Sequence, residues 1–268
     1  MTSVTAFAAV SYNILATAYI HRSRYPNASD AILDPAWRTP ALVKHIVAMD
    51  ADLLCLQEVE PVVFRALQAA LGAHGFAGEY ARKLGKRPEG LAVFFRLARF
   101  ELADARVMAG RDHRGKADDT GHVTQFVVLR GGDRTIGVIN THLAWDPPET
   151  PLADRRGLRQ TGQFLTEYRR RAFDYDGWII TGDFNVEPGS DTIAAVRQAG
   201  FSFAHQDLAG VFTCNANGVA RLVDYLFFSE RLRAEAVMPR PIDGTTVLPS
   251  DEEPSDHIAL MARLDWRP

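Results

Sequence analysis

Trp178-Ile179-Ile180-Thr181-Gly182-Asp183-Phe184-Asn185 is the most informative stretch of this chain. An apolar run of the kind that forms a buried strand ends here in a Gly-Asp-Phe-Asn tip. Polar groups that follow a buried strand are where a sheet presents chemistry. Asp183 and Asn185 are two residues apart, so on an extended segment their side chains can point to one side while Phe184 anchors the other. We therefore expect a strand end that carries a functional site.

The same pattern recurs at four other places in the chain. Each is a polar tip that follows or lies beside an apolar run and carries residue types that bind a hard cation or a phosphate. The four tips are Ser11-Tyr12-Asn13, Gln57-Glu58, Thr141-His142-Leu143 and Ser255-Asp256-His257. Any single tip could be a solvated loop, but five with one pattern indicate a site assembled from several strand ends.

The ligand types at these tips favour a hard divalent cation. Carboxylate and amide oxygens suit Mg²⁺ or Mn²⁺, whereas zinc favours nitrogen and sulfur. The residues that offer such oxygens are Asn13, Glu58, Asp183, Asn185 and Asp256. Cys55 and Cys214 have no CxxC or Cys/His spacing, so a structural zinc site is not expected. The sequence thus predicts a phosphoesterase that depends on Mg²⁺ or Mn²⁺.

Length and composition set the remaining limits. A chain of 268 residues with 47% hydrophobic residues can bury a large core, and we expect one domain over residues 1–268. The net charge of −3 argues against a general surface for duplex DNA, so no stable duplex binding is expected. The few cysteines and an N-terminus that begins directly with a strand pattern indicate a cytoplasmic protein. No run approaches the roughly 20 apolar residues that span a bilayer, so no membrane residence is expected.

Helical and β patterns alternate along the chain. Helices are expected to open at Asp34-Pro35, at Pro61, at Asp154 and near Ser190. Strands are expected in the tips above and at residues 91–95, 100–102, 124–129, 135–140, 222–228 and 258–264, with a hairpin at 131–133. Residues 17–35 and 109–121 are expected to be loops. The pattern indicates an α/β fold of two mixed β-sheets packed face to face with helices on the outside.

These motifs resemble those of the endonuclease/exonuclease/phosphatase superfamily, whose members share a four-layer α/β sandwich and a divalent metal centre. Matching positions run from Asn13 to His257. Within the superfamily, the chain is most similar to the deadenylase and nocturnin branch, through segments that include 11–15, 54–59, 90–95, 140–143 and 224–227. Glu89-Gly90 stands where that branch often has Asp-Gly, so specificity for poly(A) is not carried over.

The resemblance implies roles for the oxygen ligands. Glu58 would be the principal metal ligand, with Asn13 and Asp256 near the same centre. Asp183 would position or deprotonate the attacking water, or bind a second metal. Asn185 would contact the phosphate.

The resemblance also implies roles for the nitrogen groups. His257 would act as a base or bond to a phosphate oxygen, with Asp224 fixing its tautomer. His142 would stabilise developing charge from another strand end. Lys83 and Arg134 are expected to contact a substrate phosphate as fixed positive charges.

The expected function is hydrolysis of a phosphate ester by metal-activated water. Single-stranded RNA at its 3′ end or a nucleotide is the expected substrate, which would make the protein a 3′ exoribonuclease or a nucleotide phosphatase. Two alternatives stay open: a phosphatase of a sugar or inositol phosphate, and a phosphate-binding module without catalysis. The sequence does not distinguish diester from monoester cleavage, and it sets neither the oligomeric state nor the number of metals.

Overall fold

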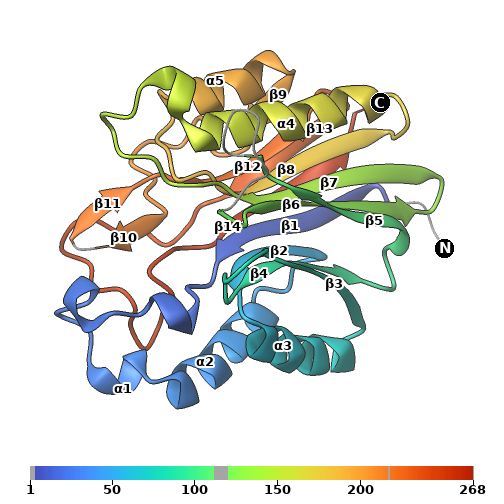
Figure 1. Ribbon diagram of the computed structural model, residues 1–268. Helices are drawn as coiled ribbons and strands as arrows, with labels where there is room; N and C mark the ends of the chain where they lie inside the picture. Colours follow the sequence, from blue (N-terminus) through green and yellow to red (C-terminus); the bar gives the residue numbers. More distant parts are fainter. Residues whose placement is uncertain (1–3, 112–119, 217, 268) are drawn as a thin grey trace.

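Two six-stranded mixed sheets form the centre of the computed structural model, which describes residues 4–111, 120–216 and 218–267 (Figure 1). Sheet A contains, in spatial order, β13 (Leu232–Val237), β14 (Leu260–Trp266), β1 (Ala6–Asn13), β2 (Leu53–Val59), β4 (Gly90–Arg96) and β3 (Phe76–Arg82). Sheet B contains β5 (Glu101–Ala109), β6 (Val123–Gly131), β7 (Arg134–His142), β8 (Gly177–Asp183), β12 (Asp224–Ser229) and β9 (Phe201–Phe203). Each sheet has one parallel pair, β1 with β2 and β7 with β8.

Helices cover the outer face of each sheet. α2 (Pro35–Ala48) and α3 (Pro61–Ala73) lie on sheet A, and α4 (Arg156–Arg171) and α5 (Asp191–Gln198) lie on sheet B (Figure 1). Their starts follow from local chemistry, because Asp34 and Ser190 accept hydrogen bonds from the first turns of α2 and α5. The predicted four-layer α/β sandwich is therefore confirmed.

Side chains that alternate along the strands pack on both faces of each sheet. Ala9, Leu53 and Val138 belong to the cluster between the two sheets. Their chain neighbours Val10 and Leu54 point to the opposite face and pack against α2 and α3. Because successive side chains of a strand point to opposite faces, strands that are apolar throughout can serve both layers.

Several elements differ from the sequence-based expectation. β3, β13, β9, β10 (Cys214–Ala216) and β11 (Val219–Arg221) were not predicted. β3 and β13 are edge strands that carry few fully buried side chains, so they lack a strong apolar signal. The expected loop 17–35 contains the short turns η1 (Thr17–Tyr19), η2 (Arg22–Arg24) and α1 (Asp30–Leu33), and η3 (Leu152–Asp154) precedes α4. Residues 112–119 of the expected loop 109–121 lie outside the described residues.

A buried pair of amides joins the sheets next to the polar tips. Gln57 on β2 donates from Nε2 to Asn140 Oδ1 on β7 at 2.8 Å. Asn140 Nδ2 in turn donates to the carbonyls of Leu56 and Ala92, at 3.1 and 3.2 Å. Because both amides are fully buried, these bonds fix the relative position of the two sheets where β2 and β7 end.

Candidate active site

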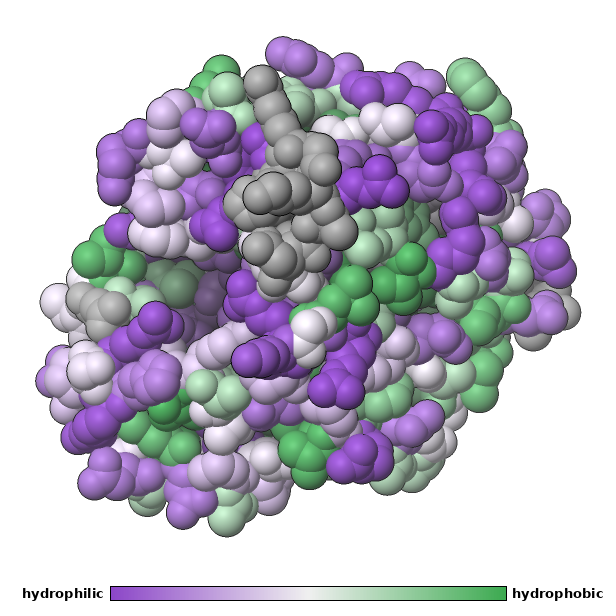
Figure 2. Space-filling view, in the orientation of Figure 1, coloured by the Kyte–Doolittle hydropathy of each residue, from purple (hydrophilic) through white to green (hydrophobic). Residues whose placement is uncertain are grey.

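The carboxyl ends of the two parallel strand pairs meet at one edge of the sandwich. Asn13 pairs with Gln57 across β1 and β2, and His142 pairs with Asp183 across β7 and β8. A hollow of about 300 Å³ opens there, lined by Glu58, His142 and Asn185 among others. Figure 2 shows the surface hollowed on this side of the molecule, beside the position of β10 and β11 in Figure 1.

Glu58 reaches the site through an irregularity of β2. The register between β2 and β4 shifts between Leu56 and Val59, and Glu58 itself has φ of +57°. A left-handed conformation is unfavourable for a residue with a side chain, and such strain concentrates at functional sites. Glu58 Oε2 accepts from the backbone N–H of Ala16 at 2.8 Å. Burial, with the nearby charge of Asp256, raises the pKa of Glu58.

Asn13 links the two sheets at the centre of the site. Its Nδ2 donates to Glu58 Oε1 at 3.2 Å and to Asp183 Oδ2 at 2.9 Å. Its Oδ1 accepts from the backbone N–H of Leu15 at 3.0 Å, which fixes the amide orientation. Asn13 therefore holds a carboxylate from each sheet side by side.

Asp183 lies between two imidazoles. Its Oδ2 is 3.7 Å from His142 Nε2 and 3.8 Å from His257 Nε2. Burial, with the charge of Asp224, raises the pKa of Asp183 to about 7. Gly182 is required just before it, because a Cβ there would lie 2.1 Å from the carbonyl oxygen of Thr141. A carboxyl group with this pKa can exchange a proton near neutral pH.

Asn185 completes the Gly-Asp-Phe-Asn tip. Its backbone N–H donates to Asp183 Oδ1 at 2.8 Å, and its Nδ2 donates to the carbonyl of Leu143 at 2.9 Å. Its φ of +54° is one that asparagine tolerates better than most residues. Phe184 is buried between the flanking elements as expected.

His257 is oriented by a buried carboxylate. Its Nδ1 lies 2.8 Å from Asp224 Oδ2, and Asp224 is fully buried. Although burial alone would lower it, the charge of Asp224 raises the pKa of His257 well above its ordinary value. His257 is therefore an imidazolium at neutral pH, with Nε2–H directed toward Asp183.

His142 has the opposite charge state. Lys83 Nζ lies 3.2 Å from His142 Nδ1 and 2.8 Å from Glu89 Oε1. Burial, with the charge of Lys83, lowers the pKa of His142 well below its ordinary value. Because an ammonium group only donates, Nδ1 of the neutral ring accepts and Nε2 carries the hydrogen. That Nε2–H faces Asp183 and Glu58, where it can stabilise an oxyanion.

The buried carboxylates fit a divalent cation. Asp256 Oδ2 accepts from the hydroxyl of Tyr25 at 2.9 Å, but its Oδ1 accepts no hydrogen bond from any described residue. Asp224 Oδ1 is also buried without a described partner. Unpaired buried carboxylate oxygens are costly unless a cation neutralises them. Ligand atoms of Asp183, Asp224 and His257 also lie within 4.8 Å of one another, so a metal could bind on that side as well.

Nine of the ten residues selected from the sequence meet at this edge of the sandwich, and Arg134 does not. Arg134 begins β7 and His142 ends it, so the strand separates the two side chains. The guanidinium of Arg134 lies over the ring of Trp266, 5.4 Å from its centroid. The structure therefore does not bring Arg134 to the other nine, because the hairpin at 131–134 lies at the opposite end of the sheet.

Other residues enter the site that the sequence did not single out. His122 is buried beside His142, with the ring centroids 6.2 Å apart, and burial lowers its pKa to about 2. Trp145, with 51% of its surface exposed, lines the hollow together with Arg156. Trp145 comes three residues after His142, so its position next to that polar tip could have indicated it as a site residue. Cys214 gave no local signal, since only the fold brings it to Asp256.

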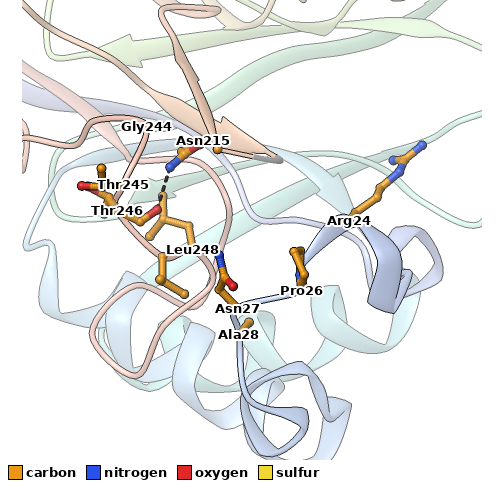
Figure 3. Close-up of a pocket in the computed structure, with 11 residues that line it drawn as sticks. Arg24, Pro26, Asn27, Ala28, Asn215, Gly244, Thr245, Thr246 and Leu248 are labelled. Carbon is orange, nitrogen blue, oxygen red and sulfur yellow. Dashed lines mark hydrogen bonds between the residues drawn. The ribbon is translucent and has the colours of Figure 1, made fainter.

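A second groove adjoins the hollow (Figure 3). Arg24 lines both, and the groove continues between Asn27, Asn215 and Leu248. Asn215 Nδ2 donates to the carbonyl of Thr246 at 2.6 Å, which ties β10 to the 244–246 segment on one side of the groove. The site is thus open on more than one side.

A four-layer sandwich whose strand ends gather buried carboxylates and imidazoles defines a hydrolase of phosphoric ester bonds. The chain belongs to the endonuclease/exonuclease/phosphatase family, whose model matches residues 10–257. The resemblance found in the motifs is confirmed, as is the predicted class of enzyme. Across the described residues, no helix combines the length and apolar character that a membrane span needs.

Two curated relatives are similar over nearly the whole chain. Bovine 2′,5′-phosphodiesterase 12 is 29% identical over 96% of this chain and 51% of its own length. The CCR4-Not complex 3′-5′-exoribonuclease subunit Ccr4 of Saccharomyces cerevisiae is 26% identical over 97% of this chain and 39% of its own length. The chain therefore spans about half the length of these relatives, or less.

Solved structures support the same fold. The structure of ANGEL2, described as a 2′,3′-cyclic phosphatase, aligns with a TM-score of 0.83 at 20% identity, over 97% of this chain and 96% of that one. The human nocturnin catalytic domain aligns with a TM-score of 0.76 at 22% identity, over 99% and 95%. These relatives confirm the similarity to the deadenylase and nocturnin branch.

Proposed function

We propose that the protein is a Mg²⁺- or Mn²⁺-dependent phosphoesterase that acts on the 3′ end of single-stranded RNA or on a nucleotide. The observation that carries the proposal is Asp183, held by Asn13 between an imidazolium and a neutral imidazole. Residues 1–268 would act as one catalytic domain, because both sheets contribute to the site. Membership of the endonuclease/exonuclease/phosphatase family rests on the match over residues 10–257.

The residues divide the reaction between them. Asp183 accepts the proton of the attacking water, for which its raised pKa is suited. His257 donates a hydrogen bond to a phosphate oxygen, and His142 stabilises the negative charge from the opposite side. Asn185 positions the phosphate. A divalent cation held by Glu58 and Asp256, next to the amide of Asn13, would, when bound, neutralise the charge of the phosphate and promote attack.

The hollow favours a nucleotide over a sugar phosphate. Lys83, Arg87 and Arg156 line it together with the half-exposed ring of Trp145. Cations attract the phosphates, and an aromatic face can stack on a base whatever its identity.

A cyclic phosphate at the RNA 3′ end is a second candidate substrate. ANGEL2 is described as a 2′,3′-cyclic phosphatase, and its fold aligns with nearly all of this chain. The site has two groups that can serve opposite sides of a phosphate, His142 and His257. When water attacks the phosphorus, one P–O bond of the ring breaks. His257 can then protonate the ribose oxygen that leaves, while Nε2–H of His142 stabilises the negative charge on the phosphate.

The test offers several phosphate esters side by side with Mg²⁺ or Mn²⁺. The set is single-stranded RNA with a 3′ hydroxyl, the same RNA with a 2′,3′-cyclic phosphate, NADP and inositol monophosphate. Mononucleotide release identifies an exonuclease, phosphate from NADP a nucleotide phosphatase, and ring opening a cyclic phosphatase. Hydrolysis of inositol phosphate alone would overturn the nucleotide assignment. Inactivity of the folded protein on all four would overturn the proposed substrate class.

A further inference from the structure

Cys214 meets the Asp256-His257 tip through backbone pairing. Cys214 forms an isolated antiparallel bridge with His257. The backbone N–H of Asn215 donates to the carbonyl of Asp256 at 3.0 Å, and that of Ile258 donates to the carbonyl of Thr213 at 2.6 Å. These bonds bring two segments together that are more than 40 residues apart in the sequence. One ligand atom from each of Cys214, Asp256 and His257 then lies within 4.8 Å of the others.

The three side chains offer a sulfur, an oxygen and a nitrogen. Asp224 occupies Nδ1 of His257, so Nε2 is the nitrogen left to bind a metal. A carboxylate that fixes a histidine in this way is the usual support of a zinc ligand. Nε2 lies 3.9 Å from Asp256 Oδ1, the oxygen that accepts no hydrogen bond from the described residues. Asp256 is only 6% exposed, so this oxygen is a buried ligand without a partner.

We propose that Cys214, Asp256 and His257 form a binding site for Zn²⁺, and that Zn²⁺ bound there inhibits the enzyme. Sulfur, nitrogen and oxygen donors with an open fourth position are a zinc set, and a thiolate disfavours Mg²⁺. Binding forms a Zn–S bond and releases the thiol proton to solvent, together with the imidazolium proton of His257. The ion binds Nε2 of His257, the atom that donates a hydrogen bond to the phosphate in the proposed function. The inhibition, but not the binding, rests on that function.

Cys214 is the most exposed of the three ligands. Cys214 is partly exposed, and the side chains of His257 and Asp256 keep 9% and 8% of their surfaces exposed. Asp256 is also one of the residues proposed to hold the catalytic cation. Zn²⁺ would therefore compete with Mg²⁺ for one ligand while it gains the sulfur that Mg²⁺ cannot use. Excess Mg²⁺ should weaken the inhibition only partly.

Binding is tested first, with Cd²⁺ as the probe, because its bond to a thiolate gives an ultraviolet charge-transfer band. The chain has two cysteines, and Cys55 is fully buried between the sheets. Wild type and Cys55→Ala should show the band with one Cd²⁺ per chain, and Cys214→Ala should not. A band that persists in folded Cys214→Ala, or that is absent from wild type, would overturn the site. This result does not depend on any enzymatic activity.

Inhibition is tested on the phosphate ester that the protein hydrolyses. With Mg²⁺ in excess, Zn²⁺ should inhibit wild type and Cys55→Ala alike, and a chelator should restore turnover. Cys214→Ser should need about tenfold more Zn²⁺ or higher, since it loses the thiolate ligand. Equal sensitivity of Cys214→Ser would overturn the inhibitory role even if Cd²⁺ binds. Inactivity on every ester would instead count against the proposed function and leave the binding result standing.

Discussion

The polar residues at the two ends of β7 differ in their surroundings. Arg134 begins the strand after a tight two-residue turn, and its guanidinium packs over Trp266 at the surface. His142 ends the strand next to Asp183 of the parallel strand β8, and it is buried. A hairpin end uses its residues to turn the chain, whereas the ends of parallel strands leave separate loops free to converge. Polar residues at a strand end therefore make a site only where several ends meet.

The largest expected effect is at the converging end. Asp183→Asn keeps the size and the contact with Asn13 but removes the proposed base. We expect turnover to fall by about 10²- to 10⁴-fold with little change in folding. Steady-state kinetics on the hydrolysed ester measure this. Asp191→Asn, at an exposed carboxylate of α5, is the matched control and should leave turnover unchanged.

Stability should depend more on the buried end of β7 than on the turn end. Asn140→Leu leaves Gln57 Nε2 and two buried carbonyls without their partner, which should cost about 2–4 kcal/mol of unfolding free energy. Thr135→Val, near the turn, removes two part-buried hydrogen bonds with Asp176, one donated and one accepted by the hydroxyl, and should cost about 1–2 kcal/mol. Urea unfolding compares the two. Equal losses would show that the inter-sheet amides are not a special support of the site.

A buried carboxyl group beside the site should make stability depend on pH. Tyr12 on β1 donates to Glu253 Oε1, and His45 Nε2 lies 3.6 Å from the same oxygen. Burial raises the pKa of Glu253 to about 7. Between the lower pKa of Glu253 in the unfolded chain and its raised pKa in the folded chain, only the folded protein keeps the carboxyl proton. This group therefore adds to the free energy of unfolding fully in acid. As pH rises through about 7, that addition, on the order of 2–3 kcal/mol, is lost.

Glu253→Gln should remove this decline, because the amide is neutral throughout and can still accept from Tyr12. Unfolding free energies between pH 5 and 8, roughly the range over which the group titrates, measure the effect. The exposed neighbour Glu252, which pairs with Arg240, gives the control Glu252→Gln. If the decline of unfolding free energy with pH persisted in Glu253→Gln but disappeared in Glu252→Gln, Glu253 would not be its cause.

The smallest effect is expected at the turn end. Arg134→Ala removes a half-buried cation–π contact and should cost about 0.5–1 kcal/mol of stability. Turnover should stay within about twofold of wild type, because the side chain is at the far end of the strand. Lys83→Ala, which removes the other cation expected to contact phosphate, should reduce turnover strongly. If Arg134→Ala impaired catalysis as Lys83→Ala does, the contrast between the two ends would fail.

The strongly patterned parts of the fold could be predicted from the sequence. The starts of α2 and α5 follow from Asp34 and Ser190, and the buried strands from continuous apolar runs. The edge strands β3 and β13 could not be predicted, since they bury few side chains fully. The site residues on strand tips could be named because each lies next to such a run. His122 could not, because its position beside His142 depends on segments distant in the sequence.

The sequence by itself determined the layers, the polar tips and the oxygen chemistry that they share. These features are local, because strand periodicity and residue type are properties of short segments. The tertiary structure alone decided which polar residues converge: it placed Arg134 away from the site and set Cys214 against His257. It also gave His142 and His257 opposite charge states, since Lys83 faces one ring and Asp224 the other. A pKa depends on burial and on neighbouring charges, and both exist only in the folded chain.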